Sequence, residues 1–523
     1  MIKTLIIVSL IISISLLFIH WYGLSTPTQD QNNRTINPNS KPVILLVIDS
    51  LMDEPLQKTI HDGKAPGLEF LMKNGHYEPQ IVSSYPTMSV TIDSTLLSGT
   101  YPDKHKVPGL VWFNEGEKRL INYGSGKGEV VKLGLKQVLQ DGLFNLNENH
   151  LSKNVETIYE QLSELQEDSA SINGLLYRGN NNHTLNIPKL ASAINLLPEN
   201  PEVNGPTLLS MGILSKLNQE NQKHDNIWQG MGFNDSFSAN ELQYLVKNRK
   251  LPSFTLSYFP DLDHQVHKNG LMDLKGIEKM DQQIQTVLNS YDSWEKAAQQ
   301  AIWIVYGDSA QSTIKANRNE AIIDLTSLNK NYRVPELGEP IKKGDEMILS
   351  VNERMAYINL LDENISYSEV ASYLQKDSRI GFTAWKENGN NHVLAAESEE
   401  KLIFRPNGNF LDQYEQSWDI SGNLNALDLS VNDQNEVKYG SYPDALARLY
   451  GALHSHQGRY IVVDAKPGFE FVGQRSPTHL GGAGHGSLHR KDSLSPLIIV
   501  GTDKRPKHNR VVDFKEWIFQ LIK

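Results

Sequence analysis

The sequence predicts an α/β protein with a largely parallel sheet sandwiched by helices and an inserted, smaller α+β lobe. The first sign is the unbroken apolar run Val43–Ile48, which ends at Asp49 and is typical of a strand buried on both faces. The second is the alternation of strand-like runs with segments of helical spacing, which is typical of a parallel sheet layered by helices. The third is the change of sequence pattern over residues 321–438, where strand-like segments are short and turns are rich in Asn and Gly.

The expected elements follow one another along the chain with polar segments between them. We expect helices where apolar residues share one helical face, and strands where apolar runs are short and end in turn-forming residues. In order, these are a helix over 155–165, strands near 172–177 and over 254–259, a helix over 277–288, strands over 301–306 and 494–500, and a helix from 512. The inserted lobe is expected to contain strands over 356–360 and 402–404 and a helix near 368–375.

Residues 4–19 contain no charged side chain and form a candidate membrane segment. As a helix they would span about 24 Å, which together with the flanking residues is close to the thickness of a bilayer. A basic residue before the segment and aromatic residues after it favour a retained membrane anchor over residues 1–24. A cleaved signal peptide is the alternative, because small residues at 23–25 suit cleavage. In either case the polar segment 25–41 is expected to tether an exported body.

Composition and charge exclude several classes of protein. The 523 residues include 50 Lys and Arg and 61 Asp and Glu, which gives a formal charge of −11. A protein that coats a nucleic-acid duplex needs a basic face, so such binding is not expected. The chain has no cysteine, which excludes disulfides, thiolate metal sites and a cysteine nucleophile. A metal ion would therefore be held by His, Asp, Glu and hydroxyl groups.

Carboxylates follow three of the predicted buried strands. Asp49 follows the first of them, Asp261 and Asp263 follow the next, and Asp308 follows the third. Because the carboxyl ends of parallel strands meet at one edge of the sheet, where ligands bind, we expect these side chains to lie close together. For any single Asp, the alternative is a helix cap or a turn former.

Two histidines add candidate metal ligands. Asp263 and His267 are four residues apart, so on a helical turn both face one point, as half of a site for zinc or another divalent ion would require. His485 lies in the segment GGAGHGS, where small neighbours let the backbone approach closely and leave the imidazole free. The alternative is a glycine loop with an incidental histidine.

Ser89, in the segment SSYPTMSVTIDSTLLSGTYPDKH, is a candidate nucleophile. Pro86 ends any preceding helix, so a helix is expected to begin at Ser89 and to stop near Gly99. A hydroxyl at a helix N-terminus lies beside free N–H groups, which favour a bound phosphate, and a metal ion would make it an alkoxide at neutral pH. The alternative is that Ser89 only caps the helix.

Together these segments resemble the alkaline phosphatase superfamily. The shared features are Asp49 after a buried strand, Tyr-Pro-Thr-x-Ser with SGTYPDKH downstream, D-x-x-x-H-x-x-G, Gly-Asp after a strand, and G-H-G. The most similar branch is that of the type I phosphodiesterases/nucleotide pyrophosphatases, matched in order over 42–320 and 439–501. The resemblance implies an alkaline-phosphatase-like fold whose catalytic core comprises 42–320 and 439–523, on either side of the lobe at 321–438.

The resemblance also implies a site for one or two divalent ions, usually zinc. The implied ligands form two sets, Asp263, His267 and His485 in one and Asp49, Ser89 and Asp308 in the other. In this branch the nucleophile is usually Thr, nine residues before the threonine of a T-G-x-Y-P segment. The same count from Ser98 reaches Ser89, and a serine there resembles the phosphatases of the wider superfamily.

Two departures from the family pattern concern the chemistry. The family's Asp-His-Gly after the late strand is here Asp308-Ser309-Ala310, so an imidazole ligand of the second metal is missing. The family's phosphate-binding Asn falls near Leu110, and loss of such a donor weakens oxyanion stabilisation by about 3–4 kcal/mol.

The sequence therefore predicts an exported, membrane-tethered, metal-dependent hydrolase of phosphoric esters, either a phosphodiesterase or a phosphatase. Ser89 is the expected nucleophile, and the expected substrate is a phosphate-ester small molecule or a nucleotide-like molecule. The alternative is a catalytically weakened or inactive surface binding protein on the same fold, because Ser309 replaces the usual histidine.

Overall fold

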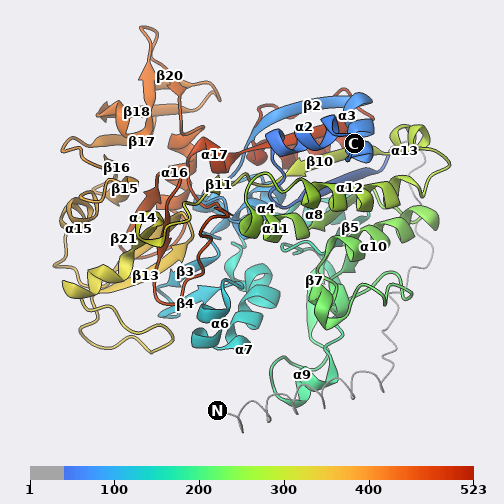
Figure 1. Ribbon diagram of the computed structural model, residues 1–523, viewed down its shortest axis with the longest axis horizontal. Coiled ribbons are helices and arrows are strands. Elements are labelled where there is room, and N and C mark those ends of the chain that lie inside the picture. Colours follow the sequence, from blue (N-terminus) through green and yellow to red (C-terminus); the bar gives the residue numbers. More distant parts are fainter. Residues whose placement is uncertain (1–40) are drawn as a thin grey trace.

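The computed structural model describes residues 41–523 (Figure 1). In this part of the chain a seven-stranded sheet has the order β2-β24-β10-β1-β9-β5-β8. Its strands are β2 (Gly75–Val82), β24 (Leu494–Val500), β10 (Ile302–Gly307), β1 (Val43–Ile48), β9 (Phe254–Phe259), β5 (Ser169–Ile172) and β8 (Leu208–Ser210). Strand β1 pairs in parallel with β9 and β10, and β5 pairs in parallel with β9 and β8. The predicted α/β class is confirmed.

Strand β24 is the exception, because it runs antiparallel to β10 and β2. The segment before β24 carries His485, which lies beside Asp263 at the carboxyl end of β9. The chain therefore enters β24 from the edge at which the parallel strands end, and must run against them.

Helices cover both faces of this sheet. The side chains of β1 alternate between two cores, with Ile44, Leu46 and Ile48 in one and Val43, Leu45 and Val47 in the other. The first core is covered by α2 (Asp53–His61), α3 (Pro66–Lys73), α10 (Asp235–Lys247) and α12 (Leu274–Leu288). The second core is covered by α4 (Ser89–Ser98), α8 (Ile158–Glu164) and α18 (Phe514–Ile522). Burial on both faces explains why β1 reads as a continuous apolar run.

A second, mostly antiparallel sheet lies beside the first and appears on the left of Figure 1. Its order is β13-β14-β21-β15-β16-β17-β20-β19, with β18 paired to β17. The strands are β13 (Met347–Asn352), β14 (Met355–Leu360), β15 (Ile380–Glu387), β16 (Asn390–Ala395), β17 (Leu402–Asp412), β18 (Ser417–Gly422), β19 (Leu429–Val431), β20 (Glu436–Tyr439) and β21 (Tyr460–Ala465). The sheet extends beyond the range 321–438 expected for the inserted lobe, because β21 inserts between β14 and β15.

Most expected elements have bounds close to those that their patterns predict, and three differ. The strand expected over 402–404 is β17, which continues to Asp412. The strand near 172–177 ends at Ile172, because Asn173 takes a positive φ of 54° and its side chain donates to the carbonyl of Gly232. The helix over 155–165 begins only at Ile158, where Thr157 and Glu160 form a capping box.

Within residues 41–523, no helix has both the length and the apolar character needed to cross a membrane. The anchor or signal expected over 1–24 lies outside the described residues. The same is true of the tether expected over 25–41, apart from its last residue.

A buried ion pair joins the second sheet to the first. Arg354, in the turn between β13 and β14, donates through Nη1 to Oδ1 of Asp492 at 2.6 Å, and both side chains are fully buried. Arg354 also donates through Nη2 to the carbonyl of Ala465, and its backbone N–H donates to the carbonyl of His485. The ion pair therefore holds the β13–β14 turn against the short helix α17 (Arg490–Ser493), which directly precedes β24.

Replacing Arg354 by Met is expected to lower the free energy of unfolding by about 3–5 kcal/mol, because Asp492 would stay buried without its partner. The measurement is urea unfolding of both proteins. Arg405→Met is the control, since the exposed pair of Arg405 with Asp419 is worth less than about 1 kcal/mol. Equal losses in the two variants would contradict this role of Arg354.

Candidate active site

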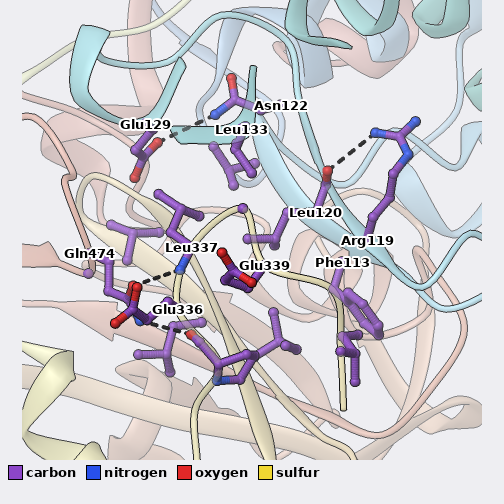
Figure 2. A pocket seen from close by; sticks show the side chains of 18 of the residues that line it. Phe113, Arg119, Leu120, Asn122, Glu129, Leu133, Glu336, Leu337, Glu339 and Gln474 are labelled. Atoms are coloured by element: carbon purple, nitrogen blue, oxygen red, sulfur yellow. Dashed lines mark hydrogen bonds between the residues drawn. The ribbon is translucent and has the colours of Figure 1, made fainter. Parts of the chain in front are cut away.

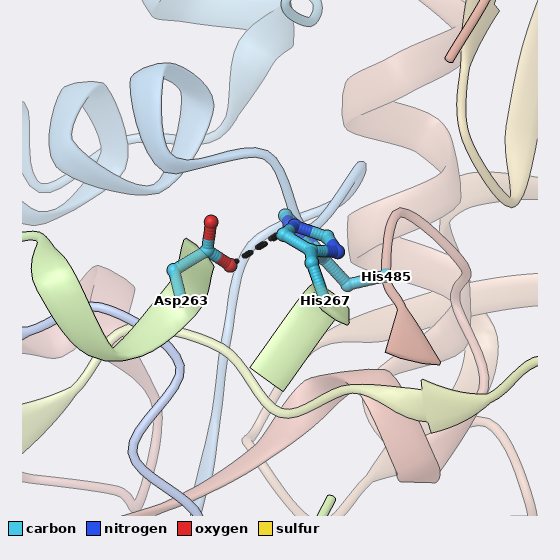
Figure 3. A group of neighbouring side chains, drawn as sticks. All are labelled: Asp263, His267 and His485. Atoms are coloured by element: carbon cyan, nitrogen blue, oxygen red, sulfur yellow. Dashed lines mark ion pairs between the residues drawn. The ribbon is translucent and has the colours of Figure 1, made fainter. Parts of the chain in front are cut away.

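Three predicted metal ligands converge at the carboxyl end of β9. Helix α11 (Asp261–Asn269) places Asp263 and His267 one turn apart, with Nε2 of His267 3.1 Å from Oδ1 of Asp263. Nε2 of His485 lies 3.6 Å from the same oxygen, although His485 comes from the loop before β24 (Figure 3). The ligand atoms of the three residues lie within 4.8 Å of one another.

The spacing and the hydrogen bonds of this triad fit a metal ion. In a tetrahedral zinc site with bonds of about 2.0–2.1 Å, ligand atoms are about 3.3 Å apart, which is close to both observed distances. The Nδ1 atoms of His267 and His485 donate to the carbonyls of Ala483 and Thr87, respectively. A carbonyl only accepts, so in each neutral imidazole Nε2 keeps the lone pair that a cation binds.

Two glycines of the segment GGAGHGS permit the approach of this loop. A Cβ atom on Gly482 would lie 1.9 Å from the carbonyl oxygen of His267. Gly486 has a φ of +113°, and a Cβ atom there would lie 2.5 Å from the carbonyl oxygen of Asn352. Residues with side chains at these positions would therefore push the loop away from α11 and from the β13–β14 turn.

The candidate nucleophile contacts the first strand-end carboxylate. Ser89 is the first residue of α4, and its Oγ donates to Oδ1 of Asp49 at 3.4 Å. The hydroxyl of Tyr258 donates to Oδ2 of the same carboxylate. The alternative that Ser89 only caps the helix is wrong, because the N-cap residue is Met88 and the Ser89 hydroxyl turns to Asp49 instead of to the helix backbone.

Asp308 presents one free carboxylate oxygen. Its Oδ1 accepts from the backbone N–H groups of Ser50, at 3.0 Å, and Ser309, at 2.6 Å. Its buried Oδ2 has no hydrogen-bond partner among the described residues. An unpaired buried carboxylate oxygen needs a proton or a cation, which is consistent with the metal-ligand role implied by the family.

Polar side chains connect Asp263 to the residues around Asp308. Oγ of Ser50 donates to Oδ1 of Asp263 at 2.8 Å and lies 3.4 Å from Oγ of Ser309. Nε2 of Gln311 donates to the same Asp263 oxygen at 2.7 Å and to Oγ of Ser50 at 2.9 Å. The structure thus brings all six predicted site residues to one edge of the sheet.

The site concentrates negative charge in a buried place. Burial, followed by the charges of Asp308 and Asp263, raises the pKa of Asp49 well above its usual value, and burial also raises the pKa of Asp308. Burial opposes the charged form of His267, but the carboxylates of Asp263 and Glu353 raise its pKa to about 10. Positive charge is therefore favoured here, and a divalent cation would supply it.

The set formed by Asp49, Ser89 and Asp308 is less complete than the triad. Among the described residues, neither Asp49 nor Asp308 belongs to a group of three His, Asp or Glu side chains with metal-site spacing. Ser309, at the position of the family's histidine, is buried, and Leu110 packs with partial burial against the second core. Ser309 offers no imidazole and Leu110 no amide, so the structure still lacks the family's histidine ligand and its phosphate-binding amide at these two positions.

A separate cavity of about 390 Å³ lies between the hairpin of β3 (Val111–Asn114) and β4 (Arg119–Asn122) and the segment 334–341 (Figure 2). Gln474 orders its rim by accepting from the N–H of Leu337 and donating to the carbonyl of Pro335. Its lining, within the described residues, includes none of the six candidate site residues.

Sequence reasoning missed several residues that touch the site. They are Ser50, Tyr258, Gln311, Glu353 and His479. Ser50 directly follows Asp49 at the end of a buried strand, so its position in the sequence could have indicated that it touches the site. The other residues lie inside a buried strand, a loop or the second sheet, where local pattern carries no sign of the contact.

A model of the type I phosphodiesterase/nucleotide pyrophosphatase family matches residues 43–488. The chain belongs to this family. The resemblance inferred from the motifs is thus confirmed, and this family member is a hydrolase of phosphoric esters. Members of the family are metal-dependent, in agreement with the groups of candidate ligands. None of the curated proteins matches this family member in sequence.

Solved structures share its fold. Human ectonucleotide pyrophosphatase/phosphodiesterase 5 has a TM-score of 0.53 at 12% identity, covering 92% of this chain and 95% of that chain. The inactive murine protein in complex with AMP has a TM-score of 0.51 with the same identity and coverage. Phosphonoacetate hydrolase from Sinorhizobium meliloti 1021, in complex with phosphonoacetate, has a TM-score of 0.53 at 12% identity, covering 95% and 100%. At this identity the likeness shows the fold alone.

Replacing Gly482 by Ala is expected to weaken the binding of a divalent ion at least tenfold, because the new Cβ atom would push the His485 loop away from His267. Overpacking should also lower the free energy of unfolding by about 1–3 kcal/mol. The measurements are calorimetric titration of chelator-treated protein with zinc, and urea unfolding. Gly116→Ala is the control, since a Cβ atom there meets only Oδ1 of Asn114, at 3.4 Å. Unchanged zinc affinity in Gly482→Ala would contradict this account of the loop.

Proposed function

We propose that this chain is an exported, membrane-tethered phosphodiesterase or phosphatase that uses Ser89 as its nucleophile. The observation that carries the proposal is the position of Ser89, whose hydroxyl contacts Asp49 at the edge that also holds Asp308 and the triad. The uncharged apolar stretch 4–19 supports the membrane tether and the extracytoplasmic location. As its substrate we propose a phosphate-ester small molecule or a nucleotide-like molecule.

Ser89 is suited to attack phosphorus. The first turn of α4 has backbone N–H groups without intrahelical partners, and the helix dipole favours a phosphate beside them. Oδ1 of Asp49, held in place by the hydroxyl of Tyr258, accepts the Ser89 proton. The bond from Oγ to phosphorus then forms as the bond to the leaving oxygen breaks, and the leaving oxygen takes up a proton and departs as an alcohol. Water later hydrolyses the phosphoseryl ester, which releases the phosphate and restores the Ser89 hydroxyl.

Asp263, His267 and His485 would hold one divalent ion, which we propose is zinc. Asp49, Ser89 and Asp308 would hold a second ion more weakly, because Ser309 replaces the histidine ligand. A bound divalent ion supplies Lewis-acid stabilisation of phosphoryl oxygens and lowers the pKa of a bound hydroxyl or water. The residues of the chain orient these ligands, since Ser50 and Gln311 fix the carboxylate of Asp263.

Replacing Ser89 by Ala is expected to lower kcat at least about 1,000-fold on aryl phosphodiester and monoester substrates, assayed with zinc or manganese. Ser89→Thr should keep measurable turnover, because it retains the hydroxyl. Ser94→Ala is the matched control five residues further along α4, where the hydroxyl donates to the carbonyl of Val90. Turnover by Ser89→Ala equal to that of the unmodified protein would reject Ser89 as the nucleophile.

A catalytically weakened binding protein is the second candidate function, favoured by the serine at position 309 and the leucine at position 110. Elemental analysis after dialysis should find one zinc ion per chain in the unmodified protein and in Asp308→Asn. Ser309→His should raise this number to two, because it adds an imidazole beside Asp308. Two ions in the unmodified protein would contradict a weakened second position. One ion together with no turnover would favour the binding protein.

A further inference from the structure

A second group of candidate ligands adjoins the triad on the side of the second sheet. Oε1 of Glu353 lies 3.7 Å from Nε2 of His267, and Oε2 of Glu353 lies 3.8 Å from Nδ1 of His479. The rings of His267 and His479 stack with centroids 4.3 Å apart. The ligand atoms of the three residues lie within 4.8 Å of one another, as they do in the triad.

We propose that Glu353 and His479 form, together with His267, a second binding position for the cation of the triad. The two positions share one atom. Because Nδ1 of His267 donates to the carbonyl of Ala483, only Nε2 can bind a cation, and it binds one ion at a time. The positions are therefore alternatives for a single ion, and neither coincides with the set of Asp49, Ser89 and Asp308. The inference rests on the proposed function only through the triad.

His479 is held as metal-bound histidines are. The buried carboxylate of Glu470, at the start of β22 (Glu470–Val472), accepts from the backbone N–H of His479 at 2.8 Å and from its Nδ1 at 2.9 Å. The carboxylate of Glu470 on Nδ1 fixes the orientation of the imidazole and leaves Nε2 as the lone-pair nitrogen, so the 3.8 Å contact of Nδ1 with Glu353 places the ring beside Glu353 and is not a distance between ligand atoms. His479 is therefore a candidate ligand whose ring is held by a buried carboxylate.

Glu353 reaches the site from a turn in which its own backbone has an unfavourable conformation. It lies in the tight turn between β13 and β14 with a φ of +53°, where Gly, Asn or Asp is usual. Its Oε2 also accepts from the backbone N–H of His485 at 3.1 Å. A Cβ atom on Gly484 would lie 3.1 Å from this oxygen, so the glycine loop leaves room for the carboxylate. Glu353 therefore contacts both ligand sets.

The proposal gives the second sheet a direct part in cation binding. Glu353 comes from a hairpin of that sheet, whereas Asp263 and His267 come from the helix that follows β9. An ion released by Asp263 and His485 would stay bound to His267 and move toward Glu353. The carboxylate and the two imidazoles on that side are a ligand set of the kind that suits zinc.

The test is titration of the full-length, detergent-solubilised, chelator-treated protein with zinc by calorimetry and with Co²⁺ by visible absorption. Asp263→Asn combined with His485→Gln removes the ligands that only the triad uses. We expect this protein to bind one zinc ion per chain with an affinity 10- to 1,000-fold below that of the unmodified protein. Adding Glu353→Gln and His479→Gln should abolish this binding and leave at most the weaker binding by Asp49, Ser89 and Asp308.

Loss of all binding in the first double variant, with its fold intact by circular dichroism, would overturn the proposal and leave the proposed function standing. Zinc affinity equal to that of the unmodified protein would instead reject the triad and, with it, the cation site of the proposed function. The two failures are therefore distinguishable without an activity assay.

A second measurement covers the case in which the double variant does not fold. Glu353→Gln with His479→Gln, in an otherwise unmodified chain, should still bind one Co²⁺ ion but with an altered visible spectrum, because one of the two ion environments is removed. Glu387→Gln with His392→Gln is the matched control. It makes the same two substitutions on the paired strands β15 and β16, away from the candidate ligands. An unchanged spectrum and affinity would overturn the proposal, because the four side chains would then form an ion-pair network only.

Discussion

The candidate site depends on the close approach of three backbone segments: helix α11, the glycine-rich loop before β24 and the turn between β13 and β14. At Gly482 and Gly486 a Cβ atom would collide with the carbonyl oxygens of His267 and Asn352. Only when these backbones are in contact can Nε2 of His485 lie 3.6 Å from Oδ1 of Asp263. The buried Arg354–Asp492 ion pair lies at the same junction, and Asp492 also accepts from the backbone N–H of Ser487 at the end of the loop, so this carboxylate holds the turn and the loop together.

Electrostatics explains why such a junction suits a cation. Asp49, Asp263 and Asp308 gather at one sheet edge, and burial raises the pKa values of Asp49 and Asp308. Burial opposes the charged form of Asp263, but His267 and then His485 keep the pKa of Asp263 low, and both residues belong to the same triad. A divalent ion bound there would neutralise the buried carboxylates in place of protons. Metal binding should therefore stabilise the fold.

The two ligand sets of this chain differ in the contacts that support them. In the triad, backbone carbonyls accept hydrogen bonds from the Nδ1 atoms and fix both imidazoles. In Asp308, two N–H groups hold one carboxylate oxygen, and the other has no partner among the described residues. Glu353 and His479 add carboxylate and imidazole groups on the opposite side of His267. Candidate ligands therefore lie on both sides of His267.

The sequence by itself predicted five of the seven strands of the central sheet, but not β2 or β8, and six candidate site residues, because buried strands read as local apolar runs and Asp49, Ser89 and Asp308 stand next to element ends. The α11 pair was readable from its four-residue spacing, and His485 from its glycine neighbours. Only the tertiary structure decided that β24 runs antiparallel, that β21 joins the second sheet, and that Tyr258, Glu353 and His479 touch the site. Those contacts join residues far apart in the chain, and no local periodicity encodes which distant backbones will meet.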